Sequence, residues 1–288
     1  MVNLVTTKAQ TIALLAPASM LLLATGVLPL GLVLYYSLNE SFGSDFMFVG
    51  SQWYAKMLSS PEFIFSVLRS FVFSGLALAF EMPLGLLIAL RLPRDGKLAS
   101  TLVVLMVLPL LTPNLVVGYL FKALALPQVG LLTWLVSLFG YDLDLKSTIA
   151  AWFVLLIMDI WHWTSLVVLF TYAGLKAIPD EYYRAAQIDA ASTWGTFRYV
   201  QFPRLKVMLG IATILRFMDS FMIYSEPLVV THGGPHTSTA FVASAFFQTK
   251  KSQFELGYGS AVSIFCFLVV VIVSLALFRL MIRQGQSR

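Results

Sequence analysis

Six long apolar runs dominate the sequence and leave few folds open to it. They cover residues 11–38, 63–90, 98–121, 147–172, 207–230 and 257–282. Because about 20 apolar residues in a helix cross a bilayer core about 30 Å thick, each run is long enough to be a span. Only 11% of the residues are charged, where a soluble domain has roughly 25%, and the mean hydropathy is +0.84. The sequence therefore predicts an all-α membrane protein with six transmembrane helices.

The distribution of basic residues predicts which ends of the spans face the cytoplasm. Lysine and arginine concentrate before the first span, in the 91–97 turn, in the 176–206 loop and after the last span. Cytoplasmic loops carry this excess, and an even number of spans returns the chain to its starting side, so we expect both termini to be cytoplasmic. We divide the chain into an N-terminal span with its outer loop (1–62), a transmembrane core (63–282) and a short tail (283–288).

The usual patterns of catalytic and metal sites do not occur in the sequence. Cys266 is the only cysteine. The histidines His162, His232 and His236 do not have the spacing of zinc ligands. No Walker A pattern is present, so we expect no ATP site in this chain, no metal, no cofactor and no enzymatic activity.

One polar stretch, residues 178–203, interrupts the apolar sequence for longer than any other segment. Pro179 suits the first turn of a helix, and the acidic residues that follow it suit the positive end of the helix dipole. Ser192 or Thr193 is a suitable N-cap for a second helix. Pro203 is expected to break the chain before the next apolar run.

This stretch resembles the cytoplasmic EAA loop of binding-protein-dependent ABC importer permeases of the maltose and glycerol-phosphate type. The family pattern has an Ile-Pro, a Glu-Ala-Ala, an Asp-Gly-Ala, a Phe and a closing Leu-Pro. The matching positions are Ile178, Pro179, Ala185, Ala186, Asp189, Ala191, Phe197 and Pro203. Arg184 stands where the family has Glu, which reverses a charge, and Ala190 replaces the turn glycine. We expect Ala190 to make the helix more continuous, because alanine avoids the entropy cost of glycine.

The resemblance implies a type I ABC importer permease fold, in which the spans after the first pack as a bundle of five. It implies that the loop docks on a cytosolic ATPase through Glu181, Arg184, Ala185, Ala186, Asp189, Ala190, Ala191 and Phe197. The implied partners are a second homologous permease, two ATPase subunits that bind ATP and magnesium, and an extracytoplasmic solute-binding protein, with no nucleic acid. The implied location is the bacterial cytoplasmic (inner) membrane, where the solute crosses by alternating access.

Polar side chains inside the fourth and fifth spans are the candidate ligand contacts, because charged groups in a span usually face a cavity or a partner. They recur at helical spacing, and in the resembling permeases the spans on either side of the EAA loop contact the substrate. The candidates are Asp159, His162, Trp163, Arg216, Asp219, Ser220 and Tyr224. A structural explanation stays open, in which Arg216 pairs with Asp219 and Asp159 pairs with His162.

The ligand expected from this pattern is a sugar, a polyol or a glycerol derivative. The residue sequence of the polar stretch resembles the glycerol-type members of the family more than the maltose-type members. This resemblance favours glycerol or a related small polyol as the ligand. If Asp219 neutralises Arg216, a neutral ligand is favoured over a phosphorylated one. The alternative is an ion-coupled secondary transporter that uses Glu81, Asp159 and Asp219, although that would leave the polar stretch unexplained.

Overall fold

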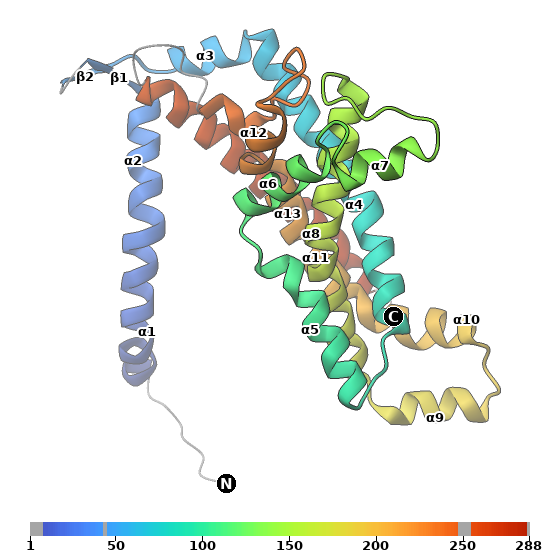
Figure 1. Ribbon diagram of the computed structural model, residues 1–288. Helices are drawn as coiled ribbons and strands as arrows, with labels where there is room; N and C mark the ends of the chain where they lie inside the picture. Colours follow the sequence, from blue (N-terminus) through green and yellow to red (C-terminus); the bar gives the residue numbers. More distant parts are fainter. Residues whose placement is uncertain (1–7, 43–44, 247–254, 287–288) are drawn as a thin grey trace. The chain divides into compact units, whose positions relative to one another are not determined.

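The computed structural model describes residues 8–42, 45–246 and 255–286, and it is built almost entirely of helices (Figure 1). The chain divides into two compact units. The first unit comprises Met1–Pro61 and Phe246–Phe267, and the second comprises Glu62–Ala245 and Leu268–Arg288. The second unit contains the polar loop and all the candidate ligand contacts.

The first unit begins with the predicted N-terminal span. Helices α1 (Lys8–Leu22) and α2 (Leu28–Ser37) are joined by a π-helical turn, Leu23–Val27, in which the Leu28 amide donates to the carbonyl of Leu23. Pro29 lies in the first turn of α2, where a missing N–H is tolerated. The chain then forms an antiparallel hairpin, β1 (Asn39–Phe42) and β2 (Asp45–Phe48), and helix α3 (Gln52–Leu58). The fold is thus mostly helical, and the expected all-α class missed this hairpin.

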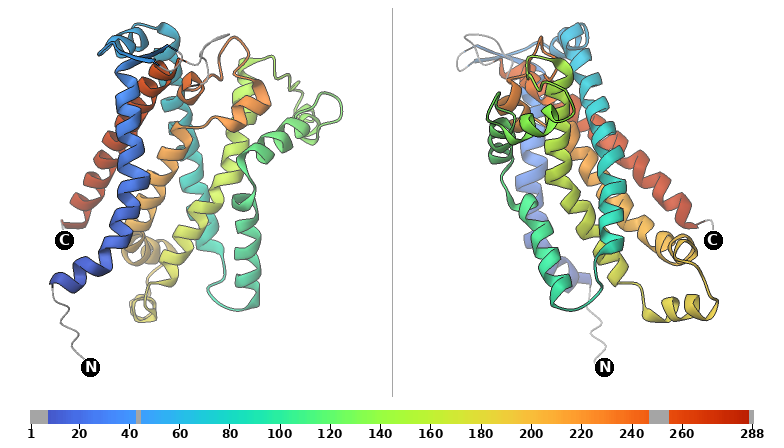
Figure 2. Two further views of the ribbon diagram at one scale, coloured as in Figure 1. Left: turned by 90° about the vertical axis from the view of Figure 1, so that its left-hand side faces the viewer. Right: turned by 45° about the vertical axis from the view of Figure 1, so that its right-hand side comes forward.

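The second unit holds the remaining helices. They are α4 (Pro61–Arg91), α5 (Lys97–Leu111), α6 (Asn114–Leu124), α7 (Leu131–Ser137), α8 (Thr148–Lys176), α9 (Asp180–Ile188), α10 (Thr193–Thr196), α11 (Phe202–Phe221) and α12 (Ser225–Thr231). A 3-10 turn follows at Val242–Phe246, and α13 (Leu256–Gln286) continues from the first unit into the second. Within this unit α9 and α10 lie at one end, and α7 and α12 lie at the other (Figures 1 and 2).

Four described helices are long and apolar enough to cross a membrane alone: Ile12–Ser37, Pro61–Arg91, Thr148–Lys176 and Leu256–Met281. Two bent pairs bring the number to six if each pair is one span. Helices α5 and α6 meet at 92°. The break falls at Thr112 and Pro113, because Pro113 has no N–H to continue the helical ladder. Pro109 lies inside α5 without ending it.

The second bend differs from the sequence prediction. Pro203 does not break the chain, since residues Thr193–Phe221 form one helical run. A π-helical turn, Phe197–Gln201, precedes the proline and places it in the first turn of α11, where its missing donor costs little. The bend of 47° comes instead between α11 and α12. The tip of the fifth run is therefore a separate short helix, which the hydrophobic pattern did not indicate.

Close helix packing fixes the centre of the second unit. A Cβ added at Gly85 of α4 would come within 2.6 Å of the Cβ of Val167 on α8, so only glycine allows this approach. Towards the α12 end, Phe73 of α4 packs against Phe241 at 4.9 Å between ring centroids. Arg69 and Ser70 of α4 hydrogen-bond the backbone of Ala240 and Val242. These contacts bind the segment after α12 to the bundle.

Candidate functional site

A single arginine joins three carboxylates inside the second unit. The Nε and Nη2 atoms of Arg216, on α11, donate to the two carboxylate oxygens of Glu81, on α4, at 2.7 and 2.9 Å. Nη2 also donates to Oδ2 of Asp159 on α8 at 2.8 Å, and Nη1 donates to Oδ2 of Asp219 at 2.6 Å. We call these four residues the Arg216 cluster. It ties α4, α8 and α11 together.

The Arg216 cluster is almost completely withdrawn from solvent. The side chains of Arg216 and Glu81 are 0% exposed and that of Asp159 is 2% exposed, whereas Asp219 is 38% exposed. A guanidinium has five N–H donors, and the four hydrogen bonds occupy four of them. Arg216 therefore has little capacity left to bind an anionic ligand, and three acidic side chains already surround it.

Aromatic and hydrogen-bonding groups of α8 lie next to the cluster. The guanidinium carbon of Arg216 lies 4.6 Å from the ring centroid of Trp163, a cation–π contact. The rings of Trp163 and His162 are 4.9 Å apart. Within the part of the chain that the structure describes, Nε1 of Trp163 and Nε2 of His162 are buried polar atoms without a hydrogen-bond partner. A buried donor without a partner is costly, so these atoms are available to a bound hydroxyl group.

The other two predicted contacts, Ser220 and Tyr224, follow Asp219 closely in the sequence, but no hydrogen bond to the Arg216 cluster is observed for Ser220. The hydroxyl of Ser220 is buried and donates to the carbonyl of Phe217 at 3.4 Å. Tyr224 is half-buried and stands at the start of α12, beyond the bend. The structure thus brings Asp159, Trp163, Arg216 and Asp219 together, while Ser220 and Tyr224 mark the end of α11 and the bend that follows it.

Glu81 is the residue of this site whose importance the sequence did not show. The sequence indicated Glu81 only as an ion site of the alternative secondary transporter, because its partner Arg216 lies 135 residues further along the chain. The expected pair of Arg216 with Asp219 is present. The alternative pairing of Asp159 with His162 is not the one observed, since Asp159 accepts from Arg216.

The polar loop at the opposite end of the second unit from α12 forms two short helices. Helix α9 ends in a Schellman motif, in which Ala190 donates to the carbonyl of Gln187 and Ala191 donates to that of Ala186. Ala190 has φ of +51°, a left-handed conformation. The expectation of a more continuous helix was therefore wrong, because the chain reverses where the family pattern has glycine even though alanine occupies the position. Ser192 caps α10 by accepting a hydrogen bond from Gly195 at 3.1 Å, as predicted.

The polar loop exposes most of the predicted docking residues together with several large apolar side chains. Ala186 is the predicted docking residue that is buried within this chain. Ile188, Trp194 and Tyr199 are 85%, 65% and 71% exposed, and they are the most exposed large apolar side chains of this loop. The other predicted docking residues, Glu181, Arg184, Ala185, Asp189 and Ala191, are exposed, and Phe197 is half-buried. Arg184 forms an ion pair with Glu181 at 3.0 Å on this surface.

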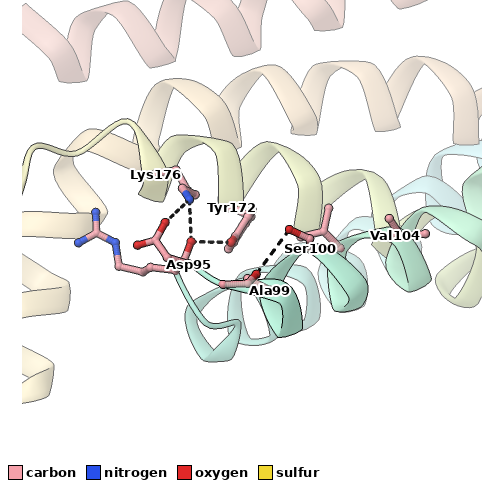
Figure 3. Close-up of a pocket in the computed structure, with 9 residues that line it drawn as sticks. Asp95, Ala99, Ser100, Val104, Tyr172 and Lys176 are labelled. Atoms are coloured by element: carbon pink, nitrogen blue, oxygen red, sulfur yellow. Dashed lines mark hydrogen bonds and ion pairs between the residues drawn. The ribbon is translucent and has the colours of Figure 1, made fainter.

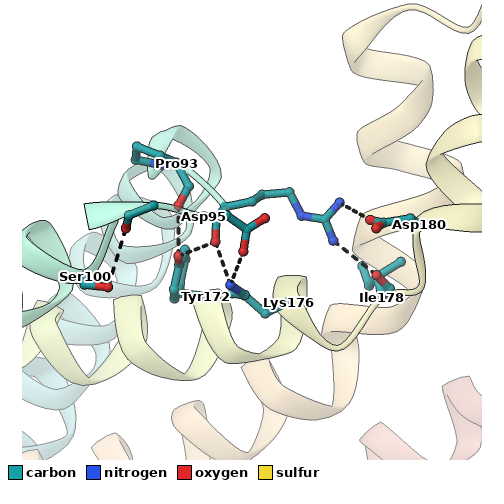
Figure 4. Close-up of polar contacts among 9 residues, drawn as sticks. Pro93, Asp95, Ser100, Tyr172, Lys176, Ile178 and Asp180 are labelled. Atoms are coloured by element: carbon teal, nitrogen blue, oxygen red, sulfur yellow. Dashed lines mark hydrogen bonds and ion pairs between the residues drawn. The ribbon is translucent and has the colours of Figure 1, made fainter. Parts of the chain in front are cut away.

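A strap of hydrogen bonds connects the α4–α5 turn to the start of the loop (Figure 4). Arg94 donates to Asp180 at 2.9 Å and to the carbonyl of Ile178 at 3.2 Å, and it stacks on Tyr183 at 4.3 Å. Lys176 donates to the carbonyl of Arg94 at 2.6 Å. We call these contacts the Arg94 strap. They join the end of α8, the beginning of α9 and the turn between α4 and α5.

A groove of about 500 Å³ lies beside the strap, between α5 and α8 (Figure 3). Lys176 pairs with Asp95 at 2.7 Å at its polar edge, and this hydrogen bond and positive charge lower the pKa of Asp95. Val103 and Val104 form the apolar wall. Because Lys176 and Asp95 at its edge are already paired with each other, we do not assign the groove as a ligand site.

The described residues contain no group of three or more His, Cys, Asp or Glu side chains in an arrangement that could hold a metal ion. The carboxylates of the Arg216 cluster are all directed at the guanidinium. The groups that lie beside the cluster are hydrogen-bonding atoms of His162 and Trp163 and the aromatic face of Trp163.

Comparisons with known proteins extend this description. Residues 81–284 match the sequence profile of the family described as "Binding-protein-dependent transport system inner membrane component". The chain is 32% identical over 249 residues to the trehalose/maltose transport system permease protein MalF of Thermococcus litoralis, which covers 85% of this chain and 84% of that protein. It is 28% identical over 274 residues to the trehalose transport system permease protein SugA of Mycobacterium tuberculosis, covering 93% and 87% of the two chains.

A solved structure shows the same fold. A chain in the crystal structure of a bacterial alginate ABC transporter, in complex with an alginate pentasaccharide-bound periplasmic protein, superposes with a TM-score of 0.80 at 17% identity. The match covers 96% of this chain and 95% of that one. The family match does not favour the ion-coupled secondary transporter, and a permease subunit leaves ATP hydrolysis to a separate chain. The protein is thus a multi-pass membrane protein, and it belongs to the binding-protein-dependent transport system inner membrane components, the permease subunits of ABC importers.

Proposed function

We propose that this chain is one of two homologous permease subunits of an ATP-driven sugar importer. The observation that carries the proposal is the family match over residues 81–284, which begins at Glu81 and includes every candidate ligand contact and the polar loop. The named relatives are permeases for trehalose and maltose, which supports a sugar as the ligand here. In this proposal the chain has six spans, each bent pair counting as one, and both termini are cytoplasmic.

The proposed division of the chain keeps the limits expected from the sequence. Residues 1–62 form the N-terminal span and its outer loop, residues 63–282 form the permease core, and residues 283–288 form the tail. The proposed partners are the second permease, two cytosolic ATPase subunits that bind ATP and magnesium, and an extracytoplasmic solute-binding protein. The alginate transporter, solved with a periplasmic protein bound, supports the last of these.

The polar loop is the proposed contact with the ATPase. Its exposed apolar side chains, Ile188, Trp194 and Tyr199, suit burial in a protein cleft, because large apolar groups gain free energy when they leave water. The exposed pair of Arg184 and Glu181 is proposed to lie at the rim of this contact. Ala185, Ala186, Asp189, Ala190 and Ala191 are proposed to belong to the same contact, together with Phe197, whose ring lies 5.4 Å from that of Trp194.

The proposed ligand contacts are the groups around the Arg216 cluster. Trp163 offers an aromatic face and an N–H, His162 offers a ring nitrogen, and Asp219 offers a partly exposed carboxylate. Sugar hydroxyls need such polar partners, and the C–H faces of sugars pack on aromatic planes. Ser220 and Tyr224 are proposed to line the path towards the bend.

The charge of the cluster favours a neutral ligand. Arg216 is bonded to three carboxylates, so it has no excess positive charge with which to attract a phosphate. The sequence of the polar stretch favoured glycerol as the ligand, but the named relatives give no support to free glycerol. We therefore propose a neutral sugar of the size class of a disaccharide.

The test is a ligand panel in proteoliposomes that contain the complete importer. Uptake of labelled trehalose, maltose, glycerol and glycerol phosphate is measured with the solute-binding protein outside and ATP inside. The proposal expects a sugar to be taken up in preference to both glycerol compounds. Preferential uptake of glycerol phosphate would contradict the neutral-ligand assignment, and uptake of glycerol alone would contradict the sugar assignment.

A further inference from the structure

The Arg216 cluster contains more negative charge than one arginine can neutralise. If all three carboxylates were ionised, the cluster would have a net charge of −2, obtained from one positive and three negative groups. Asp219 is partly hydrated, but Glu81 and Asp159 are 0% and 2% exposed. A buried charge without compensation is so unfavourable that the group usually binds or releases a proton instead. One of the two buried carboxyl groups is therefore expected to be neutral.

The hydrogen-bond geometry identifies which one. Both oxygens of Glu81 accept from Arg216, and this two-point contact is typical of an ionised carboxylate. Asp159 accepts through Oδ2 alone, which leaves its other oxygen free of Arg216. A proton fits on that free oxygen without disturbing any contact to the guanidinium.

The two buried carboxyl groups also meet each other. Oε1 of Glu81 and Oδ2 of Asp159 accept from the same nitrogen, Nη2 of Arg216, at 2.9 and 2.8 Å. Two ionised carboxylates that share one donor nitrogen repel each other, and a hydrogen bond between them requires a proton. With the proton on Asp159, its O–H donates to Glu81, whose oxygens can accept from both neighbours.

The surrounding groups are consistent with this arrangement. The charged side chains that act on Asp159 are Glu81 on α4 and Arg216 and Asp219 on α11. His162 follows three residues later on its own helix, and Glu226 on α12 acts on Asp219 and Arg216. Arg216 is the one cation among them, and it is shared by three acids. No second positive charge in this set would hold Asp159 in its ionised form.

We propose that Asp159 holds a proton at neutral pH and donates it in a hydrogen bond to Glu81. Asp159 is then a positioning residue, because it fixes the carboxylate that in turn fixes Arg216. When the pH rises far enough to remove this proton, Glu81 and Asp159 repel each other. The contact between α4, α8 and α11 is then weakened. The link to the ligand path rests on the proposed function, whereas the protonation itself does not.

The first test is infrared spectroscopy of the complete, detergent-solubilised importer. The wild-type complex should show the C=O stretch of a protonated carboxylic acid at neutral pH, and this band should shift when aspartate is labelled with carbon-13. The band should be absent from Asp159→Asn and present in Asp142→Asn, a control at an exposed position. A wild-type spectrum without a band that responds to aspartate labelling, or a band that persists in Asp159→Asn, would overturn the proposal.

The second test uses the pH dependence of thermal unfolding of the same complex. The amide of Asp159→Asn can donate to Glu81 and accept from Arg216, so it imitates the protonated acid and should keep the neutral-pH midpoint. The wild-type midpoint should fall at alkaline pH, and this fall should be smaller in Asp159→Asn. Asp159→Ala should be destabilised at every pH. If Asp159→Asn is as unstable as Asp159→Ala at neutral pH, Asp159 is an ionised partner and the proposal is wrong. Since neither test measures transport, a failure of the sugar assignment would leave their result unchanged.

Discussion

Arg216 determines the arrangement of the residues around it. Its guanidinium donates to acids on three helices, and the face of its π-system lies against Trp163. A buried arginine without a counter-charge would cost much folding free energy. The contribution of each acid to stability therefore depends on how deeply that acid is buried. Glu81 provides the fully buried two-point contact, while Asp219 provides a contact that water can partly replace.

A first prediction compares these two acids. Glu81→Gln removes the buried counter-charge and should destabilise the fold by roughly 3–5 kcal/mol, the usual cost of breaking a buried ion pair. Asp219→Asn should cost about 1 kcal/mol or less, because its side chain is partly solvated and Arg216 keeps both buried partners. From the sequence alone Asp219 was the nearest counter-charge to Arg216. Thermal unfolding of the two variants in the complete importer checks the order, and equal losses would contradict it.

A second prediction concerns Ala190 in the turn after α9. Its left-handed conformation costs a residue with a Cβ about 1–2 kcal/mol, and glycine avoids this cost. Ala190→Gly should therefore slow amide hydrogen exchange in residues 186–191. The matched control is Ala185→Gly within helix α9, where glycine should speed exchange instead. Faster exchange in Ala190→Gly would show that the turn is not strained.

At the scale of helices, the Arg94 strap is the described connection between the polar loop and the turn that ends α4. Helix α4 continues from this turn to Glu81 and the Arg216 cluster. If α9 contacts the ATPase as proposed, Arg94 and Lys176 provide the hydrogen bonds through which a movement of α9 would reach α4.

The third prediction tests this transmission. Arg94→Ala should keep the basal ATPase activity of the complex within about twofold but reduce its stimulation by the loaded solute-binding protein, because the loop would no longer be tied to α4. Arg91→Ala, at an exposed position in the same turn region, is the control and should keep normal stimulation. Normal stimulation in Arg94→Ala would show that the strap does not couple the two sites.

A fourth prediction concerns the contact between α4 and α8. Gly85→Ala places a Cβ against Val167 and should destabilise the unit by roughly 1–3 kcal/mol, the typical cost of overpacking. Gly75→Ala lies in the same helix with no heavy atom within 4 Å of the added Cβ, and it should be neutral or slightly stabilising. Thermal unfolding of both variants measures the difference. A Gly85→Ala protein as stable as wild type would mean that the helices can separate without cost.

The sequence predicted the helices better than it predicted their bends and cross-helix contacts. Apolar runs indicate the long helices and Pro113 accounts for the α5–α6 break, since both depend on local chemistry. The bend after α11 has no proline at the break itself, and the π-helical turn before Pro203 depends on backbone shifts that a hydrophobic pattern does not record. The pair of Glu81 and Arg216 was hidden because the two residues are far apart in the chain.

At the scale of the whole molecule, the polar loop and the Arg216 cluster are assigned different tasks in the proposed importer subunit. The exposed side chains of the polar loop are proposed to contact the ATPase, the Arg216 cluster lies in the bundle, and family membership connects the chain to transport that depends on a binding protein. Alternating access requires that energy released at the loop reaches the ligand path. In this account the energy comes from ATP on a partner chain, not from the titration of Glu81, Asp159 or Asp219.

The most direct measurement of this claim is sugar uptake by proteoliposomes under separated energy sources. Vesicles containing the complete importer are loaded with ATP and magnesium, with a non-hydrolysable ATP analogue, or with a pH gradient and no nucleotide. The account predicts uptake only with hydrolysable ATP, and none when the ATPase subunits are omitted. Uptake driven by the pH gradient in vesicles that lack ATP and the ATPase subunits would contradict it.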